Sequence, residues 1–221
     1  NCLNLKPNAQ KETRIAYIVR VAIMNSGGKD SASAWWWTLC RGWEITNIIT
    51  VRVTGGDSHM FQIPGIDISK VQAEIVGIPY TEIEVGGEQD VEIEELRSAL
   101  VQLDIDGLVI GALRSDYQKS RLERMCEQLG IHIWTPLWHQ EGEAHVRQLI
   151  ENKFKVMISG VSCEGLDASW LGKILTMEDF YDLKRLSEKF RFHVDGEGGE
   201  YETIVLAGPH LSNDITIKYE K

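Results

Sequence analysis

A short run of small and charged residues near the start of the chain has the composition of a phosphate-binding loop. Residues 26–31 read Ser-Gly-Gly-Lys-Asp-Ser and follow residues 20–25, an apolar run that is typical of a buried strand. Residues 30–40 then read as a helix. Because glycine lets backbone N–H groups come close to an anion at a helix N-terminus, we predict that this loop binds the phosphates of ATP.

The other residues of the loop suit the same chemistry. Ser26 and Ser31 can donate hydroxyl hydrogen bonds to a phosphate, Lys29 supplies positive charge, and Asp30 is a candidate ligand for the Mg²⁺ that accompanies ATP. The spacing is not that of a Walker loop, so transfer of the γ-phosphate is not implied. The loop resembles that of the ATP pyrophosphatase (PP-loop) superfamily, which implies cleavage between the α- and β-phosphates.

The elements that must position this loop alternate between strands and helices. Further strands are predicted at 45–53, 80–85 and 107–111, and helices at 68–76, 92–103 and 120–129. This alternation is the pattern of an α/β fold with a doubly wound parallel sheet. After the segment 134–138 the rhythm changes to helices near 144–152 and from Thr176 on, and strands at 155–161 and 203–207. We expect a polar lead-in (1–19), an ATP-binding domain (20–134) and a smaller α+β substrate-binding domain (135–221).

Composition narrows the class of protein. The net charge is −10, so we expect no nucleic-acid partner. No apolar run reaches the roughly 18 residues that span a bilayer, so we expect no membrane span. The four cysteines contain no C-x-x-C pair, which disfavours a zinc site or a disulfide framework and favours the cytoplasm.

Three later segments add residues that suit a ligand site. Residues 111–121 follow a predicted strand and precede a helix, which places them at the carboxyl edge of the sheet, where open α/β folds bind ligands. Residues 169–172 read Ser-Trp-Leu-Gly, and residues 196–203 surround Glu197 and Glu200 with glycines. Glycine and glutamate are also common in surface turns, so composition alone leaves the role of this last segment open.

In this order and spacing, these segments and residues 26–31 resemble the diphthine–ammonia ligase family. The resemblance runs from about Arg20 to about Pro209, and it includes residues 135–138 and the group Met60, Phe61 and Pro64. It implies a Rossmann-like fold of the adenine nucleotide alpha hydrolase type. It also implies that ATP adenylates the carboxylate of diphthine on elongation factor 2, and that ammonia then displaces AMP to give diphthamide.

The resemblance also implies roles for individual residues. ATP binding falls to Ser26, Gly27, Gly28, Lys29, Asp30, Ser31, Gly111 and Ala112. Catalysis falls to Lys29, Asp30, Glu197, Glu200 and Arg121, the last steadying the leaving pyrophosphate. Contact with the substrate falls to Ser115, Tyr117, Gln118, Gly172, Gly198, Gly199 and Thr203. Because aromatic faces and a carboxylate hold a trimethylammonium group best, we add a hypothetical cage of Trp138, Trp170 and Tyr201 beside Glu197 or Glu200.

The sequence departs from the family pattern at two positions and leaves other functions open. Asn25 replaces the usual aromatic residue before the loop, and Gln62 stands where relatives often have histidine. Eukaryotic relatives carry extra C-terminal domains that this sequence lacks, so it resembles the short archaeal form. The alternatives are an adenylating synthetase that amidates a small-molecule carboxylate, and a non-catalytic nucleotide sensor. The sequence also leaves open whether the chain forms a homo-oligomer.

Overall fold

A computed structural model describes residues 17–54, 68–86, 91–112, 114 and 116–218 of the chain. The lead-in up to residue 16, Ser115, and the predicted matches Met60, Phe61, Gln62 and Pro64 lie outside the described residues, and so does the side chain of Gln118. The first part of the described chain holds β1 (Arg20–Met24), α1 (Lys29–Cys40), β2 (Glu44–Val53), α2 (Ile68–Val76), β3 (Tyr80–Val85), α3 (Val91–Leu100), β4 (Gly107–Val109), α4 (Asp116–Leu129) and β5 (His132–Trp134). The rest holds α5 (Gly142–Glu151), β6 (Lys155–Val161), the short 3-10 helix η1 (Ala168–Trp170), α6 (Met177–Phe190) and β7 (Tyr201–Ala207).

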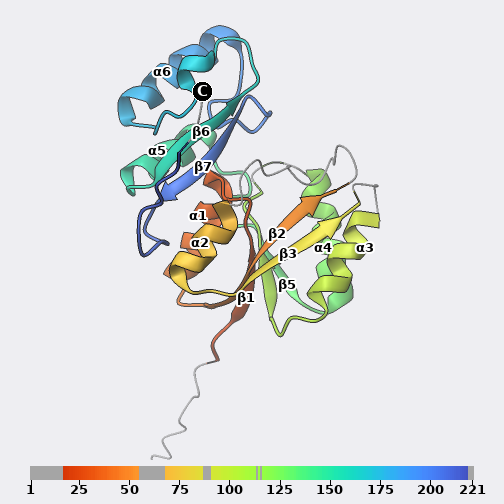
Figure 1. The fold of residues 1–221 in the computed structure, drawn as a ribbon. Helices are drawn as coiled ribbons and strands as arrows, with labels where there is room; N and C mark the ends of the chain where they lie inside the picture. The colour runs from red at the N-terminus through yellow and green to blue at the C-terminus, as the bar shows by residue number, and fades with distance from the viewer. Residues whose placement is uncertain (1–16, 55–67, 87–90, 113, 115, 219–221) are drawn as a thin grey trace, which may run out of the picture.

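The first part is a five-stranded parallel sheet with the strand order β3-β2-β1-β4-β5. Helices α1 and α2 cover one face, and α3 and α4 cover the other (Figure 1). The chain winds outward from β1 in one direction and then in the other, so the switch point lies between β1 and β4. In folds of this kind the ligand binds at the carboxyl ends of the strands beside that point. The predicted doubly wound fold is confirmed.

The largest differences between the predicted and the observed local structure are at α4 and β5. Helix α4 begins at Asp116, four residues before the predicted start at Ser120. Strand β5 was not predicted at all, because a strand of three residues, His132–Trp134, is too short to show a hydrophobic period. It pairs with β4 and completes the sheet at its edge.

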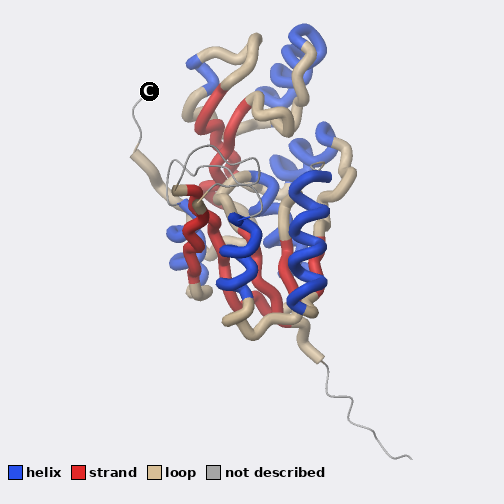
Figure 2. The backbone as a smooth tube through the Cα atoms, turned by 90° about the vertical axis from the view of Figure 1, so that its right-hand side faces the viewer, coloured by secondary structure: helices blue, strands red, loops and turns tan. Residues whose placement is uncertain are grey.

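The C-terminal part is built on a small antiparallel sheet of β6 and β7, with α5 and α6 packed beside it. Figure 2 shows these two strands beyond one end of the parallel sheet. A small apolar cluster joins the two parts, because Ile68 of α2 packs against Met157 of β6 and against Ile204 and Leu206 of β7. Strand β7 also lies next to the beginning of α1, where Thr203 reaches the predicted phosphate-binding loop.

The three consecutive tryptophans of α1 reach three different surroundings. Trp35 is fully buried under the parallel sheet, Trp36 lies edge-on to Phe154 in the C-terminal core, and Trp37 lies edge-on to Trp43. Helical spacing sends neighbouring side chains in different directions. The cluster therefore ties α1 to both parts of the molecule.

His210 is a buried histidine with a consequence for acid stability. It follows β7 and lies against Trp35 and Phe154, with ring centroids 5.0 and 5.3 Å away. Neither of its ring nitrogens has a hydrogen-bond partner among the described residues. Burial lowers the pKa of His210 to about 4, because an imidazolium cannot be solvated in this apolar setting.

We expect the His210→Leu variant to resist acid better than the wild-type protein. Between the ordinary histidine pKa of about 6.5 and the folded value, the unfolded chain takes up a proton that the folded chain refuses. The free energy of unfolding should therefore fall by up to about 3 kcal/mol more in the wild type than in the variant as the pH drops through this window. Urea unfolding at pH 7 and at pH 4.5 measures this loss in the free energy of unfolding, and His132→Gln, a change at an exposed histidine, is the control. Parallel losses in all three proteins would contradict this expectation.

Candidate active site

The loop of residues 26–31 follows β1 and opens α1, as predicted, and it lies at the switch point of the sheet. Gly27 adopts a left-handed backbone with φ of 83°, which favours glycine. A Cβ there would overlap the side chain of Ile68. The Gly27 carbonyl accepts hydrogen bonds from the backbone N–H of Val205 in β7 at 2.9 Å and from Gln72 Nε2 at 3.3 Å. The loop is therefore fixed by the C-terminal sheet and by α2, which lie far away in the sequence.

Asn25, one of the two departures from the family pattern, holds the loop through hydrogen bonds of its side chain. Its side chain is buried, and its Oδ1 accepts a hydrogen bond from the Gly27 N–H at 3.1 Å. Its Nδ2 donates to Ser69 Oγ at 3.0 Å and to Gln72 Oε1 at 2.8 Å. An apolar aromatic residue could not make these bonds. Asn25 thus joins the loop to the beginning of α2.

The beginning of α1 is capped from outside the helix. Gly28 occupies the N-cap position and has no side chain to accept a hydrogen bond. Thr203 of β7 supplies the acceptor, because its Oγ1 lies 3.2 Å from the backbone N of Lys29. Within the loop, Ser31 Oγ donates to the Gly28 carbonyl at 3.1 Å and lies 3.4 Å from Ser26 Oγ. Thr203, predicted to contact substrate, is therefore seen supporting the loop.

Lys29, Asp30 and His145 form a chain of charged and polar groups at the loop. Lys29 Nζ lies 2.8 Å from Asp30 Oδ2, and His145 Nε2 of α5 lies 2.8 Å from Asp30 Oδ1. Burial opposes charge on both loop residues, yet their mutual attraction raises the pKa of Lys29 and, with His145, lowers the pKa of Asp30. The sequence did not reveal His145, because nothing in a single histidine indicates a contact 115 residues away.

Gly111 brings the second predicted segment against the loop. It follows β4, and a Cβ at this position would lie 2.6 Å from the Asp30 backbone carbon and 2.7 Å from the backbone N of Ser31. Only glycine permits this approach. Farther along, the Arg121 guanidinium stacks on the ring of Tyr117, 3.7 Å from its centroid, in the first turns of α4.

The segment between α6 and β7 is held by two of its three acidic residues. The Glu200 carboxylate accepts hydrogen bonds from the backbone N–H groups of Gly198, at 2.7 Å, and His193, at 2.8 Å. Burial opposes charge on Glu200, but these bonds outweigh it and lower the pKa of this carboxyl. Asp195 is buried, lies against Gly142 and is 3.3 Å from Arg114 Nη2.

Glu197 is the third acidic residue and differs from the other two. Its side chain is half-buried, and no hydrogen bond or ion pair engages its carboxylate among the described residues. Burial raises the pKa of Glu197 to about 7, and the negative charges of Asp30 and Asp195 act in the same direction. Lys29 and Arg114 partly offset them. The charges of the loop therefore act on Glu197, and the segment that carries it lies near the loop, because Lys29 Nζ is 5.9 Å from the ring centroid of Tyr201, which directly follows that segment.

Comparison with known proteins decides the family. The model of the diphthamide synthase N-terminal domain matches residues 19–133, and that of the C-terminal domain matches residues 141–221. The chain belongs to the diphthine–ammonia ligase family. Diphthine–ammonia ligases of mouse and human are each 32% identical to it over 223 residues, which cover 90% of this chain and 83% of the relative. The resemblance inferred from the motifs, the ligase class and the amidation of diphthine are thereby confirmed.

Relatives of the family differ in length. The fission yeast diphthine–ammonia ligase is 30% identical, but the match covers only 36% of that protein. The match covers 83% of the mouse and human proteins, so the expectation that eukaryotic relatives carry extra C-terminal domains does not hold for all of them. Among solved structures, one described as a predicted subunit of a tRNA methyltransferase from Methanocaldococcus jannaschii covers 90% of this chain at 17% identity. Its TM-score of 0.44 is too low for this similarity to support any conclusion about the chain.

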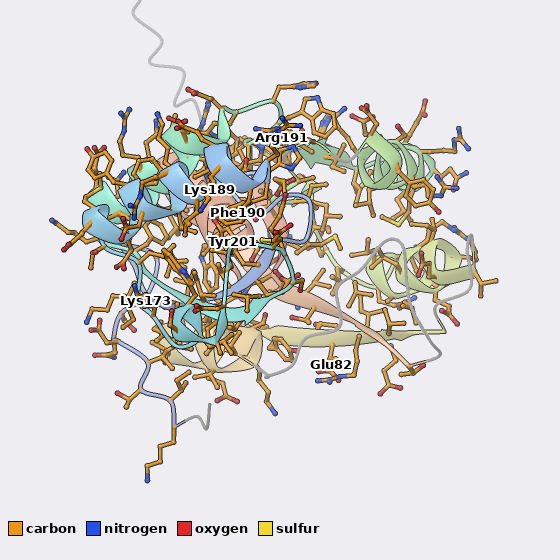
Figure 3. All side chains as sticks on the ribbon, turned by 90° about the horizontal axis from the view of Figure 1, so that it is seen from above. Glu82, Lys173, Lys189, Phe190, Arg191 and Tyr201 are labelled. Carbon is orange, nitrogen blue, oxygen red and sulfur yellow. The ribbon has the colours of Figure 1, made fainter. Side chains whose placement is uncertain are left out.

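Two of the three rings of the hypothetical aromatic cage are buried in the C-terminal core. Trp170 and Tyr201 are 6% and 2% exposed and both lie in the C-terminal core. The Tyr201 hydroxyl donates to the Val194 carbonyl at 2.7 Å, and Figure 3 shows this residue toward the middle of the molecule. Trp138 lies in another segment, where Lys119 Nζ is 4.9 Å from its ring. Trp170 and Tyr201 are thus packed in the core, whereas Trp138 is half-buried, and the cage stays a hypothesis.

The other residues predicted to contact ATP or the substrate lie in different parts of the molecule. Ala112 follows Gly111 and is half-buried, whereas Gly172 lies in the C-terminal part, where its N–H donates to the Ile158 carbonyl at 2.9 Å. Gly198 and Gly199 are exposed in the segment that carries Glu197. No group of three or more histidine, cysteine or acidic residues suited to a metal ion occurs in the described part of the chain. Within that part, no helix is long and apolar enough to cross a membrane.

Proposed function

We propose that this chain uses ATP to convert diphthine on elongation factor 2 to diphthamide with ammonium as the nitrogen donor. The observation that supports it most is the loop of residues 26–31, because β7, α2 and α5 together fix it at the switch point of the sheet. Glu197 belongs to the segment before β7, and β7 contacts this loop through Thr203 and Val205. The groups proposed to bind the phosphates and the group proposed to act on the second step therefore belong to neighbouring segments.

The reaction proceeds in two steps that this arrangement suits. The diphthine carboxylate attacks the α-phosphorus of ATP, and pyrophosphate leaves. Lys29 and the N–H groups at the beginning of α1 stabilise the charge that develops on the phosphates. Ammonia then attacks the acyl-adenylate carbon, and AMP leaves with the bonding electrons. Lys29 must leave Asp30 for the phosphates, while His145 keeps Asp30 in place.

Mg²⁺ is part of the proposal through Asp30. Magnesium is usually held by one or two carboxylates together with substrate phosphates rather than by a cage of protein ligands. The single carboxylate of Asp30 at the phosphate-binding loop fits that requirement, and the bound ion would neutralise phosphate charge. Arg121, stacked on Tyr117, is proposed to steady the pyrophosphate, and the parts 20–134 and 135–221 are proposed as the ATP-binding and substrate-binding domains.

The products distinguish this function from its competitors. We expect the protein, incubated with ATP, Mg²⁺, ammonium and diphthine-bearing elongation factor 2, to release AMP and pyrophosphate and to lower the mass of the factor by about the difference between a carboxylate and an amide. Chromatography of nucleotides and mass spectrometry of the factor measure both. ADP in place of AMP would overturn the PP-loop chemistry. AMP formation only with small carboxylic acids would favour a small-molecule amide synthetase.

A further inference from the structure

The three acidic residues between α6 and β7 divide into two that hold the backbone and one that does not. Glu200 is buried and bound to two backbone N–H groups, and Asp195 is buried, accepts the Glu197 N–H at 3.4 Å and lies next to Arg114. Only Glu197 is half-buried without a partner for its carboxylate among the described residues. Its own backbone is therefore fixed, while its carboxylate is left available.

The charges around Glu197 come from three elements. Lys29 and Asp30 at the beginning of α1, Asp195 in its own segment and Arg114 after β4 all act on it electrostatically. Lys29 Nζ lies 5.9 Å from the ring centroid of Tyr201, which directly follows the segment of Glu197. Burial and the two negative groups raise the pKa of Glu197 to about 7. A carboxylate with this pKa is a far better proton acceptor than an exposed one, whose pKa is about 4.3.

We propose that Glu197 removes a proton from ammonium and so generates the ammonia that attacks the adenylated carboxylate. This inference rests on the proposed function and names the residue that prepares its second substrate. At neutral pH the nitrogen donor is almost entirely ammonium, which has no lone pair for attack. A half-buried carboxylate next to the phosphate-binding loop can attract this cation and then take its proton.

The proton and electron balance is complete within the established reactants. Ammonium and the Glu197 carboxylate give ammonia and the Glu197 carboxylic acid. The nitrogen lone pair forms the C–N bond, and the C–O bond to AMP breaks with its electrons on AMP. The nitrogen then loses a second proton to solvent, which leaves the neutral amide, and Glu197 returns its proton to solvent before the next turnover.

Hydroxylamine provides a test, because it is mostly unprotonated at neutral pH and needs no base to become a nucleophile. We expect Glu197→Gln to lower kcat/KM for ammonium by about 100-fold, the usual size of a general-base contribution. With hydroxylamine the variant should form the hydroxamate at a rate close to that of wild type. Exchange of pyrophosphate into ATP, which reports adenylation without ammonia, should also stay near the wild-type rate. Glu188→Gln, the same change at an exposed position of α6, is the matched control.

The outcomes separate this role from the alternatives. Equal losses with ammonium and hydroxylamine would overturn the proposal and indicate that Glu197 positions the substrate carboxylate. A raised KM for elongation factor 2 alone, or no change with either nucleophile, would overturn it too. If wild-type protein adenylated no diphthine at all, the exchange assay would show that the proposed function itself had failed, and the inference would fall with it.

Discussion

Replacing Lys29 with methionine is expected to reduce AMP formation by about 1000-fold, the upper range for loss of one group that stabilises transition-state charge. Lys29 is 5% exposed and lies at the beginning of α1, so no solvent cation can take its place on the phosphates. Lys29→Arg is expected to restore little, because the planar guanidinium does not fit the space of an ammonium group. AMP release under saturating ATP measures both variants.

A control and a stability measurement keep the result for Lys29 interpretable. Lys189→Met changes an exposed lysine of α6 and should leave the rate unchanged. Asp30 retains His145 as a partner in Lys29→Met, so we expect a folded protein with a small shift in its thermal transition. Activity within tenfold of wild type in a folded Lys29→Met variant would contradict a role for this residue in ATP cleavage.

Gly111→Ala is the second change with a large expected effect. The added methyl group would meet the backbone of Asp30 and Ser31 at 2.6–2.7 Å, and backbone cannot rotate away as a flexible side chain can. We expect a loss of about 2 kcal/mol in the free energy of unfolding, which is typical of overpacking. Displacing the beginning of α1 should also lower kcat/KM for ATP by about 100-fold, because small misplacements of bound groups are costly.

Gly86→Ala is the matched control for Gly111→Ala. Among the described residues, an added Cβ at Gly86 would meet only the far end of the Glu95 side chain, at 3.9 Å, which is ordinary contact. Urea unfolding and steady-state kinetics of both variants make the comparison. Similar stability and activity in the two variants would show that the close approach of Gly111 to the loop does not matter.

The local structure around the loop could be predicted because its signals are close together in the sequence. An apolar strand, a Gly-Gly pair and a helix occupy one continuous stretch, residues 20–40, and each leaves its own pattern. The alternation of strands and helices up to Val109 likewise predicted the parallel sheet. Strand β5 escaped because three residues carry no period.

The roles of the predicted site residues were harder to predict, because burial decides them. Glu197 and Glu200 are three residues apart in a glycine-rich segment and look equivalent in the sequence. In the fold the carboxylate of Glu200 is used up by backbone N–H groups, whereas that of Glu197 is not. Trp170 and Tyr201 suggested a binding surface, but both are needed to fill the C-terminal core.

The sequence by itself thus determined the fold class and the local structure of residues 26–31, the loop proposed to bind ATP, since both depend on short-range patterns. The tertiary structure alone decided what fixes that loop. Thr203 caps α1 from 174 residues away, and His145 reaches Asp30 from α5. Such contacts follow from how β7 and α5 pack against α1, and no spacing in the sequence records that packing. The residue types that suit the loop for its chemistry are therefore recorded locally in the sequence. The contacts that hold the loop, and the position of Glu197 near it, depend on the packing of the whole fold.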